Sequence, residues 1–92
     1  MKQCVKIHVM GKVQGVGYRS YVQKYAQKLA IEGFVQNLDD GAVTILACGT
    51  SDKLDQFIDE VYKGSASTKV QDVAVEPVMQ IKDFRGVFRI IE

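Results

Sequence analysis

The sequence predicts one small α+β domain, in which two helices cover one face of a mostly antiparallel sheet. Three observations point to it. The 92 residues suffice for a single hydrophobic core. Apolar residues make up 47% of the chain and charged residues 25%, as in ordinary globular domains. Segments with the two-residue period of strands alternate with segments of helical period, in the order β-α-β-β-α-β followed by one more strand.

The first strand is expected over residues 4–10. Val5, Ile7 and Val9 alternate there with other side chains, as in a strand with one buried face. The next seven residues, 11–17, hold three glycines and therefore predict a tight loop.

A helix over about residues 18–30 follows, and Gly33 suits its exit. The apolar stripe of this helix is Tyr18, Tyr21, Val22, Tyr25, Ala26 and Leu29. Two strands, 34–38 and 42–48, then flank Asp39-Asp40-Gly41. An Asp-Gly pair between two apolar runs predicts a hairpin, with both aspartates as turn residues.

The second helix begins at Ser51, whose side chain can cap it, and ends at Gly64. Its expected buried stripe is Leu54, Phe57, Ile58, Val61 and Tyr62. Strands around 70–76 and 84–91 finish the chain. This order is that of a ferredoxin-like β-α-β-β-α-β sandwich with an extra C-terminal strand. No linker or repeat divides the sequence, so residues 1–92 are expected to form a single domain.

The charge balance disfavours a polyanion binder. Lys and Arg number 12 and Asp and Glu 11, which gives a net charge of +1, whereas nucleic-acid-binding domains usually carry a strong basic excess. No run approaches the roughly 18 apolar residues that span a bilayer. Lys6 and His8 interrupt the N-terminal apolar stretch, unlike a signal peptide. We therefore expect a cytoplasmic monomer without nucleic-acid or membrane partners.

A metal or a cofactor is not expected. The two cysteines, Cys4 and Cys48, are too far apart for a CxxC motif, and the single histidine, His8, leaves few nitrogen ligands. His8 is interpreted as a residue of the sheet face rather than a general base.

The chemistry is expected at the glycine-rich loop, residues 13–19. A loop that leaves a strand and opens a helix directs several backbone N–H groups toward one point, where they can hold an oxyanion. Arg19 stands in the first helical turn, where a cation is disfavoured by about 0.3–1 kcal/mol, so it is expected to face an anionic ligand. The alternative is a sharp turn followed by a solvated arginine. The loop lacks the spacing of nucleotide-binding motifs, so a site for one phosphate-sized group fits better.

Two motifs carry a family resemblance. Gly11-Lys12-Val13-Gln14-Gly15-Val16-Gly17-Tyr18-Arg19 resembles the GxVQGVxxR signature of the acylphosphatase family. Gly33-Phe34-Val35-Gln36-Asn37-Leu38-Asp39-Asp40-Gly41-Ala42-Val43 resembles its second signature, GxVxNxxDGxV. Their order and spacing match, and the resemblance covers essentially the whole chain. It implies metal-independent hydrolysis of the carboxyl-phosphate bond of a small-molecule acyl phosphate, giving a carboxylate and orthophosphate.

The resemblance also implies roles for particular residues. Asn37 would hold the attacking water. Separately, a cradle of N–H groups and one guanidinium predicts inhibition by inorganic phosphate or sulfate. The residues expected at the phosphoryl group are Gln14, Gly15, Val16, Gly17, Tyr18 and Arg19. Arg19 supplies a permanently charged fork for two oxygens, and Asn37 an acceptor that needs no shifted pKa. The alternative for Asn37 is a bond to its own turn. Tyr18 is also interpreted as a core anchor, and the side chain of Gln14 as unimportant.

Two other functions occur on folds of this element order. RNA-recognition domains share this element order but stack bases on aromatic residues of the two central strands, and residues 4–10 and 42–48 contain none. An acylphosphatase-like domain can also serve a larger carbamoyl-transfer enzyme. Because the sequence ends at Glu92, we expect a free-standing hydrolase.

The strand register predicts a disulfide. In this fold the first and third strands are antiparallel neighbours. Placing Cys4 opposite Cys48 leaves the alternate residues, which point to the other face of the sheet, entirely apolar. On that face Val5 pairs with Ala47, Ile7 with Ile45 and Val9 with Val43. Directly opposed residues lie about 4.5–5.5 Å apart, within disulfide range. We expect the pair to be reduced in the cytosol and oxidised in an oxidising compartment. The alternative is two small buried hydrophobic residues.

Overall fold

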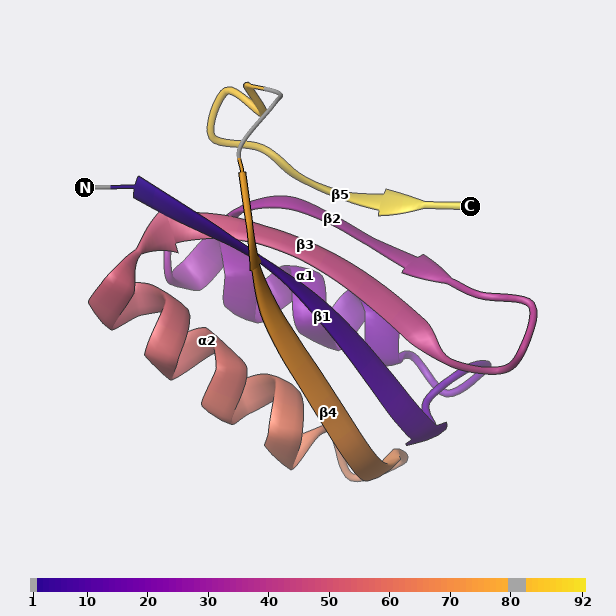
Figure 1. Ribbon diagram of the computed structural model, residues 1–92. Coiled ribbons are helices and arrows are strands. Elements are labelled where there is room, and N and C mark those ends of the chain that lie inside the picture. The colour runs from indigo at the N-terminus through magenta and orange to yellow at the C-terminus, as the bar shows by residue number, and fades with distance from the viewer. Residues whose placement is uncertain (1, 80–82) are drawn as a thin grey trace.

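The computed structural model describes residues 2–79 and 83–92, which form a layer of two helices against a five-stranded sheet (Figure 1). The elements are β1 (Lys2–Lys12), α1 (Tyr18–Lys28), β2 (Glu32–Asn37), β3 (Val43–Thr50), α2 (Ser51–Lys63), β4 (Lys69–Val78) and β5 (Phe88–Ile91). The strand order is β4-β1-β3-β2-β5, antiparallel except for the parallel β2–β5 pair. The predicted ferredoxin-like sandwich with an extra C-terminal strand is confirmed.

The core lies between the sheet and the two helices. The predicted register of β1 on β3 is confirmed, with Val5 opposite Ala47, Ile7 opposite Ile45 and Val9 opposite Val43. The helices meet this face with Tyr18, Val22, Ala26, Leu54, Phe57 and Val61, all buried. The prediction that Tyr62 is buried is wrong, since this residue is 53% exposed. Each fully buried large apolar side chain stabilises the fold by about 1.5–3 kcal/mol. Alternation in the sequence therefore identifies the buried face correctly.

The exit of α1 differs from the prediction. The helix ends at Lys28, and the residue that takes the left-handed conformation after it is Ala30, with φ 56°. Gly33 instead lies inside β2, where a Cβ would overlap the carbonyl oxygen of Leu46 on β3. The glycine therefore permits close approach of two strand backbones rather than the helix exit.

Two further expectations about element ends are wrong. Ser51 is the first residue of α2; the N-cap is Thr50, and no side chain caps the helix. The last strand spans four residues rather than eight, because the chain turns before it. In that turn Val87 N–H donates to the Phe84 carbonyl at 3.0 Å, and Arg85 has φ 54°. The predicted end of α2 at Gly64 is confirmed.

Two tyrosine hydroxyls of α1 bond the C-terminal end of α2. Tyr18 Oη donates to the carbonyl of Val61 at 2.8 Å, and Tyr21 Oη donates to that of Glu60 at 2.9 Å. The last four carbonyls of a helix lack partners within it. The Glu60 carbonyl also accepts from Gly64 N–H at 3.1 Å. Burial raises the pKa of Tyr18 well above its usual value, and burial, reinforced by Glu60, raises the pKa of Tyr21 to about 12.

Replacing Tyr18 by Phe is expected to destabilise the protein by about 1–3 kcal/mol, because the buried carbonyl of Val61 loses its hydroxyl donor. Tyr21→Phe is the matched control, since the Glu60 carbonyl keeps Gly64 as a donor. Thermal unfolding should show a fall of roughly 4–8 °C per kcal/mol for Tyr18→Phe and a clearly smaller one for the control. Equal shifts for the two variants would contradict this assignment.

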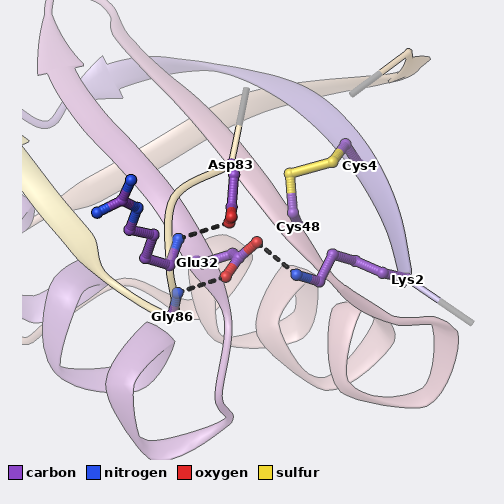
Figure 2. The surroundings of a disulfide bond; sticks show 7 residues. Lys2, Cys4, Glu32, Cys48, Asp83 and Gly86 are labelled. Atoms are coloured by element: carbon purple, nitrogen blue, oxygen red, sulfur yellow. Dashed lines mark hydrogen bonds and ion pairs between the residues drawn. A yellow bond between two sulfur atoms is a disulfide. The ribbon is translucent and has the colours of Figure 1, made fainter. Parts of the chain in front are cut away.

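The two cysteines form a disulfide on the sheet face opposite the helices. Cys4 lies directly across from Cys48, as the register predicts, and the two are bonded (Figure 2). Both are buried. The alternative of two unbonded hydrophobic side chains is therefore wrong for this structure.

A buried carboxylate adjoins the disulfide. Glu32 lies on β2, opposite Cys48 of β3, and is 5% exposed. Its Oε1 accepts from Lys2 Nζ at 2.6 Å and its Oε2 from Gly86 N–H at 2.6 Å (Figure 2). The hydrogen bond to Glu32 raises the pKa of Lys2. This carboxylate connects the start of β1 to the turn that precedes β5.

Candidate active site

The loop between β1 and α1 turns on glycines in the left-handed conformation. Gly15 and Gly17 have φ 73° and 79°, in the left-handed region that favours glycine. A Cβ at either position would meet nothing within 4 Å, so conformation rather than space requires these glycines. Gly17 is the N-cap of α1 and no side chain caps that helix. The first N–H groups of α1 therefore have no side-chain acceptor and are available to a ligand.

A pocket of about 170 Å³ opens at this loop. Its lining comes from the loop, the first turn of α1, the end of β2 and the end of β5: Val13, Gly15, Gly17, Tyr18, Arg19, Ser20, Asn37, Ile90 and Glu92. Drug-sized ligands occupy pockets of about 300–1,000 Å³, so this one suits a smaller group.

Arg19 is held at the pocket by β5. Its Nη1 donates to the carbonyl of Ile91 at 3.1 Å and lies 3.7 Å from Glu92 Oε1. The side chain is 27% exposed. A guanidinium has five N–H donors in a planar fork, so these contacts leave donors for an anion. The strand thus holds the arginine side chain without using all of its donors.

Asn37 brings an unpartnered acceptor to the same pocket. It is the last residue of β2, opposite Val43 on β3. Its Oδ1 is buried and has no hydrogen-bond partner in the described part of the chain. The alternative of a side chain that bonds its own turn is not what the structure shows. An unpaired buried polar atom destabilises a fold by about 1–3 kcal/mol. Such an atom is expected where a bound water or ligand supplies the missing hydrogen-bond partner.

The side chain of Gln14 has a role that sequence reasoning missed. Its Nε2 donates to the carbonyls of Leu38 at 2.7 Å and Ala42 at 2.8 Å, at the base of the β2–β3 hairpin. These bonds tie the loop to the hairpin that carries Asn37. The expectation that this side chain is unimportant is therefore wrong. The sequence shows that the side-chain amide of Gln14 can donate hydrogen bonds. It does not show their acceptors, because these lie more than twenty residues away along the chain.

The pocket brings together five of the predicted site residues and leaves two aside. Gly15, Gly17, Tyr18, Arg19 and Asn37 line it, whereas Gln14 and Val16 do not. The side chain of Tyr18 is almost fully buried, in agreement with its interpretation as a core anchor. The lining residues that the sequence did not indicate are Ser20, Ile90 and Glu92.

The other predicted roles have structural counterparts away from the pocket. Asp40 acts in the turn, where its Oδ1 accepts from Ala42 N–H at 3.0 Å. His8 lies on β1 opposite Thr44, on the same sheet face as Cys4. Within residues 2–79 and 83–92, no group of three or more His, Cys, Asp or Glu side chains could hold a metal ion. None of the helices described has the length and apolar character needed to cross a membrane.

Comparisons with known proteins show the family to which this chain is similar. A model of the acylphosphatase family matches residues 5–90. The acylphosphatase of Bacillus licheniformis is 45% identical over 80 residues, which cover 87% of this chain and 89% of that protein. The crystal structure of acylphosphatase from Bacillus subtilis matches all of both chains at TM-score 0.92 and 40% identity. The crystal structure of full-length HypF in its phosphate- and nucleotide-bound form matches at TM-score 0.86 and 26% identity, with 12% of that chain covered.

Proposed function

This chain belongs to the acylphosphatase family, and we propose that Arg19 and the loop of residues 14–19 hold a phosphoryl group while Asn37 orients the attacking water. The enzyme hydrolyses acyl phosphates. The observation that carries the proposed roles is the convergence in one pocket of an uncapped helix start, a guanidinium and an unpartnered amide oxygen.

The proposed reaction is an in-line attack of water on phosphorus. As the new phosphorus–oxygen bond forms, the bond between phosphorus and the acyl oxygen breaks, and the carboxylate leaves with its electron pair. The water proton passes to an oxygen of the phosphoryl group, so the products are a carboxylate and orthophosphate. A carboxylate is a good leaving group and needs no strong general acid. Phosphoryl transfer depends mainly on positioning and charge stabilisation, which the N–H groups and Arg19 supply.

Inorganic phosphate and sulfate are expected to inhibit competitively against benzoyl phosphate, because the proposed site recognises a tetrahedral oxyanion through N–H groups and one guanidinium. Activity should be unchanged by EDTA. Steady-state kinetics with each anion and with chelator measure both effects, and amide chemical shifts of residues 14–19 report where phosphate binds. Inhibition by EDTA that magnesium or zinc reverses would contradict the proposal, as would phosphate binding that leaves those amide signals unmoved.

Asn37→Ala is expected to lower kcat about 10²-fold, because a water that is misplaced by as little as about 1 Å loses that much rate. Gln36→Ala is the matched control: Gln36 precedes Asn37 on β2, projects to the opposite sheet face and does not line the pocket. Both variants should keep the far-ultraviolet circular dichroism of the wild type. Full activity in Asn37→Ala, or an equal loss in Gln36→Ala, would refute the role of Asn37.

The likeness to full-length HypF supports a second candidate, a phosphate-binding domain within a larger enzyme. We propose instead that this chain turns over small acyl phosphates by itself, as a cytoplasmic monomer, because the acylphosphatase structure from Bacillus subtilis matches it over all of both chains. The two candidates differ in one assay on the isolated chain. Release of phosphate from acetyl or benzoyl phosphate supports the free-standing hydrolase, whereas phosphate binding without turnover supports the domain.

A further inference from the structure

The pocket contains a second charge that the proposed reaction does not use. Among its lining residues the charged side chains are Arg19 and Glu92. Arg19 is 27% exposed and Glu92 is 88% exposed, so the carboxylate lies nearer the solvent end of the pocket. Arg19 also bonds the carbonyl of Ile91, which places the backbone of Glu92 next to the guanidinium.

A bound acyl phosphate would lie close to this carboxylate, because Glu92 lines the same pocket as Arg19. Its phosphoryl group would lie at the glycine loop and Arg19, as proposed above. The acyl group would then extend away from the loop, toward the remaining exposed or half-exposed lining residues, Ser20, Ile90 and Glu92. A neutral acyl group meets the apolar side chain of Ile90 and carries no charge toward Glu92. An acyl group with its own carboxylate would bring two negative charges together.

We infer that Glu92 is a specificity-determining residue, which favours acyl phosphates with neutral or cationic acyl groups over those with anionic acyl groups. The inference rests on the proposed function, because it takes Arg19 as the phosphoryl ligand. Glu92 would also repel the phosphoryl group itself, but that effect is common to all substrates. The ratio of kcat/KM for a neutral substrate to kcat/KM for an anionic one therefore measures the selection by acyl charge alone.

The expected effect is moderate because Glu92 is exposed. Two like charges about 6–8 Å apart at a solvated rim change an equilibrium on the order of 3- to 10-fold at low ionic strength. The Debye length falls from about 30 Å at 0.01 M to about 3 Å at 1 M salt. The discrimination should therefore fade as salt is added, which a steric effect would not do.

The test compares benzoyl phosphate with 4-carboxybenzoyl phosphate, which differ by one distant carboxylate. For the wild type, kcat/KM should be about 3- to 10-fold higher for benzoyl phosphate at low ionic strength. Glu92→Gln should bring the ratio close to one, and Glu92→Lys should reverse it. Glu76→Gln is the matched control, since Glu76 is an exposed glutamate of β4 that does not line the pocket.

A binding experiment separates this inference from the proposed function. Titration calorimetry with phenylphosphonate and 4-carboxyphenylphosphonate gives the same charge comparison without turnover. Absent hydrolysis with the affinity ratio intact would contradict the proposed function and support the role of Glu92. A ratio that is the same in the wild type and in Glu92→Gln would overturn the inference, whatever the turnover.

Discussion

Arg19→Lys is expected to lower kcat about 10²–10³-fold while the protein stays folded. Lysine keeps the charge but presents one compact ammonium, and it cannot hold two phosphoryl oxygens with a planar fork. It also cannot reproduce the bond from Nη1 to the carbonyl of Ile91 together with a bidentate grip on a ligand. Steady-state kinetics with benzoyl phosphate measure the loss. Arg89→Lys, on β5 but outside the pocket lining, is the matched control and should keep wild-type activity.

The stability of Arg19→Gln decides whether the arginine serves the ligand or the fold. A cation in the first turn of a helix is unfavourable by about 0.3–1 kcal/mol, and the variant removes it. The variant also loses the part-buried hydrogen bond to the Ile91 carbonyl, worth about 0.5–1.5 kcal/mol. The two terms nearly offset, so we expect a melting temperature within a few degrees of the wild type. A large fall in melting temperature, or full activity in Arg19→Lys, would show that Arg19 is structural.

The local features of the sequence sufficed to predict most of the fold. The alternation around Ile7 and Ile45 defines a buried face on each strand, and a one-residue slip would expose it, so the register follows. The same register places Cys4 opposite Cys48. The Asp-Gly turn likewise follows from the conformational preference of those two residue types.

The errors arise where tertiary contacts override a local preference. Gly33 looked like a helix exit, but the close approach of the β3 backbone requires a glycine in β2. Ala30 adopts the left-handed conformation that glycine usually takes. The buried charge of Glu32 had no local signal, because its partners Lys2 and Gly86 come from distant parts of the chain.

The residues of the pocket also fall into those that a local motif indicates and those that only tertiary contacts bring there. The loop glycines, Arg19 and Asn37 belong to two short motifs, so the sequence could indicate them. Ile90 and Glu92 reach the pocket through the parallel pairing of β5 with β2, whose register links Gln36 to Ile91. Nothing in the local pattern fixes that register, which is why the sequence alone did not place Glu92 at the pocket.

Reduction of the Cys4–Cys48 disulfide is expected to have the largest effect on stability. The bond closes a loop between residues 44 positions apart, which in the chain-entropy model stabilises the fold by up to about 4 kcal/mol. At roughly 4–8 °C per kcal/mol, the melting temperature should fall by up to about 16–32 °C on reduction. Thermal unfolding with and without dithiothreitol, alongside a count of free thiols, measures the effect. The double variant Cys4→Ala/Cys48→Ala is the control and should not respond to reductant.

Activity below the melting transition should be nearly unaffected by reduction, because the disulfide and the pocket lie at opposite ends of β2. Glu32, the first residue of that strand, is opposite Cys48, whereas Asn37, the last, lines the pocket. A loss of activity in the reduced, folded protein would contradict this separation. Two titratable thiols after mild oxidation, with no shift in melting temperature on reduction, would show that the bond does not form in solution. Because the disulfide and the pocket are separate, reduction in a reducing cytoplasm would lower the stability of the enzyme but leave its catalytic pocket unchanged.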